Sequence, residues 1–392
     1  MYNRLMVGRR IRVRTSHAAK RGGSSDEPGP GAAVTDAPAQ QRPSEPDTVP
    51  ADGRGGADGG SRPSLDTLRS GGARVLEFES NSVLVATIVL AIVIGVLHPD
   101  FFAWSQIKDV LSQSVYVGLL AAGMAFLISM REIDLSVGSV FGLSLIVSAL
   151  LMRGGLDPWL AAVLGVLLGG AAGLVNAMLV QAIAIPAIVA TLATLSMYRG
   201  LGLALSDGQQ VTGLPTQSSF FTFLGGDALG LPVSVWVLIL TGAVLTAVLR
   251  LTPFGYRVQS NGSNPEAATF SGISIPRVRV QALVLMGLLG GLSGIMGLAF
   301  FSSGDPNVGT GFELQAIAAA VIGGTQLRGG SATVVGAMVG AILLGVVNSG
   351  LVYFNVPINW SAFATGAVIL AAVSLDSLLR RRRRGHRSGL AL

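Results

Sequence analysis

The sequence predicts an all-α, polytopic membrane protein with about ten transmembrane helices, and three observations support this fold class. Half of the 392 residues are apolar, only 12% are charged, and the mean hydropathy is +0.62, whereas a soluble globular chain carries about 25% charged residues. Apolar runs close to the roughly 20 residues that cross a bilayer recur between residues 76 and 379. Glycine is abundant, at 53 residues, which is typical of helices that pack closely in lipid.

Charge divides the chain into three predicted parts. Residues 1–75 hold 12 of the 27 basic residues and are rich in Gly, Pro and Ser, which predicts a disordered cytoplasmic tail. Residues 380–392 hold six arginines and no acid, and predict a basic cytoplasmic tail. The transmembrane domain is predicted over 76–379. The basic flanks lack interleaved aromatic residues, which argues against a nucleic-acid partner and favours a topology signal at the lipid bilayer.

Each predicted span is an apolar run bounded by polar or glycine-rich residues. The third and the eighth are the shortest. In order, the predicted spans are Ser82–Leu97, Leu111–Met130, Val137–Met152, Pro158–Gln181, Ile185–Leu205, Leu231–Leu249, Val280–Phe301, Phe312–Leu327, Thr333–Phe354 and Asn359–Leu379.

Ten spans place both termini on one side of the membrane, and the Arg380–Arg384 run predicts that this side is cytoplasmic. The connections on that side then contain six arginines, whereas the external connections contain only Lys108 and Arg153. This asymmetry supports the count of ten spans. The six arginines are Arg131, Arg250, Arg257, Arg277, Arg279 and Arg328.

The long cytoplasmic connection between the sixth and seventh spans predicts a short helix over residues 264–275. Asn264 is a good helix cap, Pro265 suits the first helical position, and Glu266 lies near the positive helix end. A helix with a small surface can dock into a cleft on a cytoplasmic partner, although an ordinary interfacial helix explains the same pattern. The small residues of this segment are Ala267, Ala268, Ser271 and Gly272.

Two further stretches place ionisable groups beside apolar helices. Between the second and third spans, Asp134, Ser136 and Gly138 follow an Arg–Glu pair. Ionisable groups at such a place favour a functional role, but helix capping by Asp134 or Ser136 is an equal alternative. At the eighth span, Glu313 heads a short helix that the Gly323–Gly324 pair can break. Spans two–three and eight–nine also predict a distant internal duplication.

The sequence lacks the residues that several classes of protein need for their function. Cysteine is absent and only three histidines occur, so no metal centre, disulfide or thiol nucleophile is expected. Neither of the two lysines, Lys20 and Lys108, lies in a Gly-Lys-Ser/Thr sequence, so this chain has no phosphate-binding loop. These absences predict that the chain is not an enzyme and holds no cofactor.

Three ordered motifs resemble the permease subunit of bacterial ATP-binding-cassette importers for ribose and related simple sugars, within the branched-chain amino acid/ribose permease superfamily. The resemblance extends over roughly residues 111–379. The motifs are GMAFLISMREIDLSVGSVFGLS (Gly123–Ser144), SNPEAATFSGISIPRVR (Ser263–Arg279) and GFELQAIAAAVIGGTQLRGGSATVVGAMVGAILLGVVNSGL (Gly311–Leu351).

This resemblance implies a transport subunit of a bacterial plasma (inner) membrane, namely a type II importer permease that pairs with a second copy or a sibling chain. It also implies a cytoplasmic ATPase partner, which would bind ATP and Mg, and an extracytoplasmic solute-binding protein. Residues 264–275 would be the coupling helix to the ATPase. The residues implied in the family signature or the translocation path are Asp134, Ser136, Gly138, Glu313, Gln315 and Asn348.

The chain departs from the family pattern at Arg131 and Glu132, where Gly-Gly is usual, and at Gln315, where Asp is common. A permease for branched-chain amino acids or an autoinducer remains an alternative to a sugar permease. An ion-coupled secondary transporter is a weaker one, because such proteins use charged groups within the membrane. Only Arg199 lies well inside a predicted span.

Overall fold

The computed structural model describes residues 83–357 together with residues 360, 363, 364, 366, 367, 370 and 374. All of them belong to the second of two compact units, Ser61–Leu392. The two predicted tails, 1–75 and 380–392, lie outside the described residues. So does most of the tenth predicted span, 359–379.

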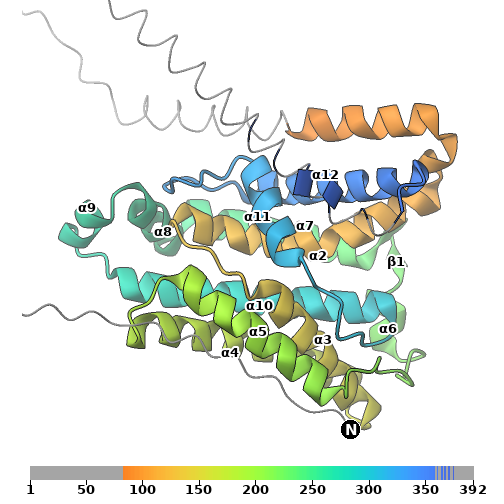
Figure 1. Cartoon of the computed structure of the whole chain (residues 1–392), viewed down its shortest axis with the longest axis horizontal. Helices are drawn as coiled ribbons and strands as arrows, with labels where there is room; N and C mark the ends of the chain where they lie inside the picture. Colours follow the sequence, from red (N-terminus) through yellow and green to blue (C-terminus); the bar gives the residue numbers. More distant parts are fainter. Residues whose placement is uncertain are drawn as a thin grey trace, which may run out of the picture. The chain divides into compact units, whose positions relative to one another are not determined.

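The described chain is mainly helical (Figure 1). Six of its helices are long and apolar enough to cross a membrane: α2 (Trp104–Ser129), α4 (Pro158–Ala182), α5 (Ala187–Leu205), α7 (Val233–Leu251), α10 (Ile275–Phe301) and α12 (Val334–Tyr353). Shorter apolar helices are Val83–Leu97, α3 (Val137–Arg153) and α11 (Phe312–Ile322). The remaining elements are the 3₁₀ helix η1 (Pro99–Phe102), α6 (Ser219–Leu224), the strands β1 (Asp227–Ala228) and β2 (Leu231–Pro232), α8 (Pro253–Ser263) and α9 (Pro265–Phe270).

The polytopic helical fold is confirmed, whereas the count of ten spans stays a prediction. The eighth predicted span, Phe312–Leu327, is too long, because α11 ends at Ile322 before Gly323 and Gly324. Gly324 has φ of 95°, a conformation that side-chain-bearing residues rarely adopt. Eleven helical residues extend only about 16 Å, so non-helical chain must complete any crossing at this place.

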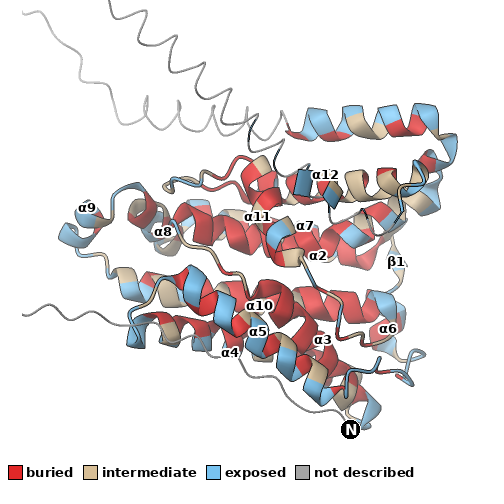
Figure 2. Cartoon of the chain, viewed as in Figure 1, coloured by how far each residue is buried: buried red, intermediate tan, exposed pale blue. Residues whose placement is uncertain are grey.

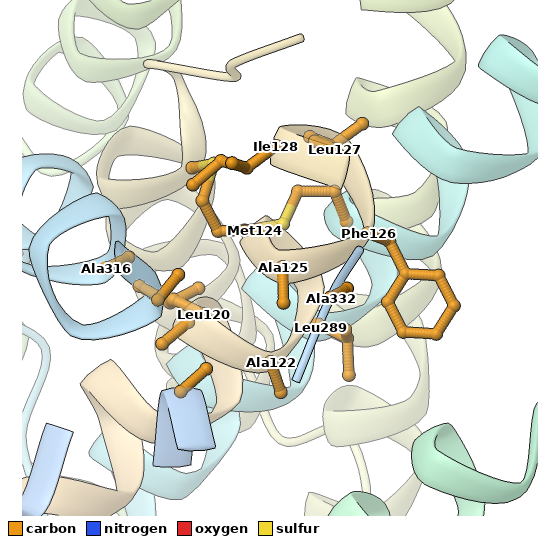
Figure 3. Packing of buried hydrophobic residues seen from close by; sticks show 14 of the residues in the cluster. Leu120, Ala122, Met124, Ala125, Phe126, Leu127, Ile128, Leu289, Ala316 and Ala332 are labelled. Atoms are coloured by element: carbon orange, nitrogen blue, oxygen red, sulfur yellow. The ribbon is translucent and has the colours of Figure 1, made fainter. Parts of the chain in front are cut away.

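Helices α2 and α10 form the centre of the described bundle. Figure 2 shows both mainly buried, whereas α4, α5 and the helix Val83–Leu97 expose one face. The exposed side chains on these outer helices are largely Leu, Val and Ile, as lipid contact requires. Figure 3 shows Leu289 of α10, Ala316 of α11 and Ala332 gathered around the side chains of α2.

The packing repeats within the chain. Helix α2 packs on α11 and α12, and α10 packs in the same way on α3 and α4. The pairs α3–α4 and α11–α12 also contact each other within their own halves. The repeat therefore relates the three helices α2–α3–α4 to the three helices α10–α11–α12. The sequence had suggested a repeat of two helices, with spans two–three (α2–α3) matching spans eight–nine (α11–α12). Repeats of this kind are frequent in transporters.

Candidate functional site

The predicted capping of residues 264–275 is confirmed in α9. Asn264 Oδ1 accepts a hydrogen bond from the backbone N of Ala267 at 3.1 Å, and Pro265 holds the first helical position. Helix α9 ends at Phe270, so the helical part is shorter than predicted. Ala267 is exposed and Phe270 is 94% exposed, whereas Ala268 is buried against the chain itself. Ala268 therefore packs α9 against the rest of the chain, and Ala267 is the small residue that α9 exposes on its surface.

The α8–α9 pair lies at the end of the bundle opposite α6 and β1 (Figure 1), and its base is held by close backbone packing. The backbone N of Gly330 donates to the carbonyl of Ser129, at the end of α2, over 2.8 Å. A Cβ at Gly262, near the end of α8, would overlap both of these backbone groups. We call this meeting of 129–131, 262–264 and 328–330 the cytoplasmic junction, in keeping with the predicted orientation.

Arg131 connects the three segments of the cytoplasmic junction by hydrogen bonds. Its Nε donates to the carbonyl of Arg328 at 2.8 Å, and its Nη2 donates to the carbonyl of Ser263 at 3.1 Å. Arg131 has φ of 64°, which costs a residue with a side chain roughly 1–2 kcal/mol and which glycine would adopt without strain. The two hydrogen bonds offset that cost.

Glu132 adds an ion pair next to this junction. Its carboxylate accepts from Nε of Arg279, near the start of α10. Burial raises the pKa of Glu132, and the Arg279 guanidinium lowers it in part. The Arg–Glu pair that departs from the family pattern thus links the connection between α2 and α3 to both ends of the segment that carries α9.

Asp134 and Ser136 belong to a buried polar network and not to a surface. The Asp134 carboxylate accepts from the backbone N of Ser136 at 2.8 Å and from its Oγ at 2.7 Å. Asn176 Nδ2 of α4 donates to Ser136 Oγ at 2.8 Å, and the Tyr198 hydroxyl of α5 donates to Asn176 Oδ1 at 3.1 Å. Asp134 is 1% exposed. Ser136 stands at the N-cap of α3 but makes no side-chain capping bond, so the predicted capping is wrong for Ser136.

Gly138 and Glu313 bring the starts of α3 and α11 together. A Cβ at Gly138 would overlap Glu313 Oε2 and the carbonyl oxygen of Gly309. Glu313 is buried, and its Oε2 has no hydrogen-bond partner among the described residues. Two carboxylates, Asp134 and Glu313, therefore lie buried within the bundle. Arg199 is therefore not alone as an ionisable group within the bundle, and the argument that made an ion-coupled transporter the weaker alternative loses part of its support.

Gln315 and Asn348, the two other predicted path residues, meet in a cavity of about 740 Å³ between α2, α11 and α12. A second cavity of about 310 Å³ shares four of its lining residues; we call the two the larger and the smaller cavity. The six predicted path residues therefore divide between the network, the α3–α11 contact and these cavities. The shared lining residues are Gln113, Gln315, Gly345 and Asn348.

The sequence interpretation missed the contribution of α2 to the larger cavity. Gln106, Asp109 and Gln113 line it, and their spacing of three and four residues places them on one helical face. Helical periodicity could have revealed this polar stripe. The second predicted span began at Leu111, because a search for apolar runs excludes a polar helix end. Three further polar residues of the predicted spans lie elsewhere: Asn176 belongs to the network, Ser196 is exposed, and Ser361 lies outside the described residues.

Comparison with known proteins gives a consistent result. A family model described as "Branched-chain amino acid transport system / permease component" matches residues 106–373. The ribose import permease protein of Bacillus subtilis is 39% identical over 74% of this chain and 89% of its own length. The L-arabinose ABC transporter permease protein of Azospirillum brasilense is 34% identical, over 78% and 89%. The autoinducer 2 import system permease protein of Photorhabdus laumondii is 34% identical, over 76% and 89%.

The chain belongs to this permease family. It is a multi-pass inner-membrane protein and the permease subunit of an ABC transporter. No solved structure matches the permease.

Proposed function

We propose that the permease carries a simple, ribose-like sugar that an extracytoplasmic binding protein delivers, and that an ATPase partner drives it through α9. The observation that carries the proposal is that α9 is exposed while its base is held by close backbone packing. On the exposed surface of α9, the small side chain of Ala267 lies near the large apolar side chain of Phe270. Arg131 and the backbone contacts at the cytoplasmic junction join that base to α2 and to the connection before α12.

The orientation follows from the two ends of the bundle. The end with α8 and α9 carries Arg131, Arg279 and Arg328. The other end carries the Lys108–Asp227 ion pair at 2.6 Å. We place the arginine end in the cytoplasm, since positive residues favour that side. Motion of an ATPase at α9 would then reach α2 and α10 and rock the two halves against each other.

The chemistry of the larger cavity favours a neutral, hydroxyl-rich solute. Its polar lining consists mainly of amides and hydroxyls, and the lining residues include no Lys, Arg or His. The carboxylate of a zwitterionic amino acid is best held by a positively charged side chain, which this lining lacks. This favours a sugar over a branched-chain amino acid. An autoinducer stays the second candidate, because a relative of similar identity is described as an autoinducer 2 permease.

A second permease, identical or a sibling, is proposed to close the open side of the larger cavity. Leu314 and Val352 line this cavity and are 57% and 68% exposed. Lipid could cover these two side chains but cannot hydrogen bond to the amides of the cavity beside them, so another protein suits this side better.

The docking role is tested by Ala267→Arg in proteoliposomes that contain the ATPase and the binding protein. Because Ala267 is exposed, the variant should insert normally, but a bulky cation should block docking and lower ATP-driven uptake at least about tenfold. Ala268 is unsuitable for this test, because it is buried. Thr212→Arg, at an exposed position between α5 and α6, is the control. Wild-type uptake by Ala267→Arg would overturn the proposed docking.

A further inference from the structure

The smaller cavity differs from the larger one in depth. The residues of α2 that line the larger cavity end at Gln113, whereas those that line the smaller cavity run from Gln113 to Val117. On α12, the smaller cavity reaches back to Ala341, toward the helix start. Both shifts lead toward the end of the bundle that carries α8 and α9. The smaller cavity thus follows the larger one along the proposed direction of transport.

Its lining combines two kinds of group that suit a sugar. Phe300, Phe301 and Phe312 supply aromatic rings, while Gln113, Gln315 and Asn348 supply amides. The face of an aromatic ring carries partial negative charge and attracts the polarised C–H groups on one side of a sugar ring. Amides donate to and accept from hydroxyls. A volume of about 310 Å³ is at the lower end of small-molecule sites.

Tyr116 provides an independent sign of a ligand. It lines the smaller cavity, is 2% exposed, and packs its ring near Phe300 and Phe301, with centroids 6.1 and 5.8 Å away. Its hydroxyl has no hydrogen-bond partner among the described residues. A buried phenol without a partner is costly, because it has lost water and gained no replacement. A solute hydroxyl would remove that cost.

We propose that the smaller cavity is a sugar-binding site within the permease, in which the Tyr116 hydroxyl hydrogen bonds to a sugar hydroxyl. The amides of Gln113, Gln315 and Asn348 bind further hydroxyls, and the phenylalanines cover the apolar face of the sugar. Tyr116 is then a specificity residue of the transport path. This inference rests on the proposed import of a sugar.

The test uses the complete transporter, with its ATPase and binding protein, in proteoliposomes. Tyr116→Phe removes only the hydroxyl. D-Ribose is the first probe, and L-arabinose and D-allose replace it if D-ribose is not carried. The variant should lower uptake about 3- to 10-fold, the effect of one lost hydrogen bond, with unchanged ATPase activity and a thermal midpoint that is unchanged or higher. Ser144→Ala is the matched control, because Ser144 Oγ also lacks a partner among the described residues and does not line the cavity.

A second measurement does not depend on this variant. The chain has no cysteine, so Gln113→Cys introduces a single thiol in the shared lining of both cavities. Sugar-loaded binding protein with ATP should slow its labelling by a small thiol reagent at least about 3-fold relative to sugar-free binding protein. Labelling of Thr212→Cys, outside the cavity, should not depend on sugar.

The possible results separate the two proposals. A wild-type transporter that carries none of the three sugars but imports an amino acid or an autoinducer overturns the proposed function. If the wild type imports a sugar, then normal uptake by Tyr116→Phe overturns the sugar-binding site. A parallel fall of uptake and thermal midpoint also overturns it, since this result assigns Tyr116 to folding. Equal protection of both thiols overturns it as well.

Discussion

The connection 130–136 between α2 and α3 and the connection 302–311 between α10 and α11 hold corresponding places in the two halves of the described permease, but their surroundings differ. At the first, Asp134 and Ser136 hydrogen bond to each other and to Asn176 in the protein interior. At the second, Thr310 and Gly311 line the larger cavity, and Gln315 follows one turn later. The polar groups of the first connection hydrogen bond within the protein, whereas the second connection lines a cavity.

The difference teaches that the role of a polar residue within a membrane bundle can be assigned only when its hydrogen-bond partners are known. Asn176 and Gln315 are both amides on apolar helices. Asn176 is fully buried and bonded to Ser136 and Tyr198, whereas Gln315 lines both cavities. We therefore expect substitutions in the first connection to impair folding, and substitutions beside the second to impair transport.

The largest effect is expected for Asp134→Leu. Leucine would leave the backbone N and Oγ of Ser136 without their acceptor in a buried place, at a cost of about 3 kcal/mol or more. Little folded permease should be recovered from membranes, as size-exclusion chromatography would measure. Asp134→Asn keeps one oxygen acceptor and should be less damaging. Normal yield and thermal midpoint of Asp134→Leu would remove the contrast between the two connections.

Gly138→Ala tests the contact that joins the two halves. The new methyl group would overlap Glu313 Oε2 and the carbonyl of Gly309, so we expect a loss of about 1–3 kcal/mol in the free energy of unfolding. Gly200→Ala is the matched control, because a Cβ there meets nothing within 4 Å. It should be neutral, or stabilise by about 0.5–1 kcal/mol. Equal thermal midpoints for the two variants would refute a close α3–α11 contact.

Gln315→Leu should separate transport from stability. We expect uptake to fall about tenfold while the free energy of unfolding changes by no more than about 0.5 kcal/mol. Asn176→Leu should do the reverse and lower stability first. Thermal unfolding and uptake measured on the same preparations give both quantities. A destabilised Gln315→Leu, or a stable but inactive Asn176→Leu, would exchange the roles assigned to the two amides.

A smaller, pH-dependent effect is expected at Glu132. Because burial raises the pKa of Glu132 despite Arg279, the folded protein binds this proton more tightly than the unfolded chain. The stability contributed by this group is therefore complete below the ordinary carboxyl pKa, and is lost as pH rises through the raised pKa. Glu132→Gln should remove this dependence, and Arg279→Met should extend it to higher pH. Thermal midpoints from about pH 4 to 8 would measure it, and an unchanged slope in Glu132→Gln would contradict it.

The sequence was sufficient where one physical signal dominates. Apolar runs located most of the long helices to within a few residues at one or both ends, and the Asn-Pro-Glu pattern located the start of α9. Helix α8 was missed, because most of its residues are polar or glycine and it lacks a long apolar run. The end of α11 was wrong, because apolar composition continues past the glycine pair that stops the helix.

The site could be predicted only in part, since its residues meet across helices far apart in the chain. Gln113 and Asn348 lie 235 positions apart but line the same cavities. No local sequence pattern predicts that two such distant residues line the same cavity. The motif residue Asp134 was correctly marked as unusual, yet its hydrogen bonds to Ser136, which place it in the interior, depend on the folded connection between α2 and α3.

The most direct measurement is solute accumulation by vesicles that contain the purified permease alone, compared with vesicles that also contain the ATPase, the binding protein and ATP. Our account makes the permease a moving gate that receives its energy through α9. The permease alone should bring the internal sugar concentration no higher than the external one, and the complete transporter should raise it well above. Accumulation by the permease alone would contradict the account.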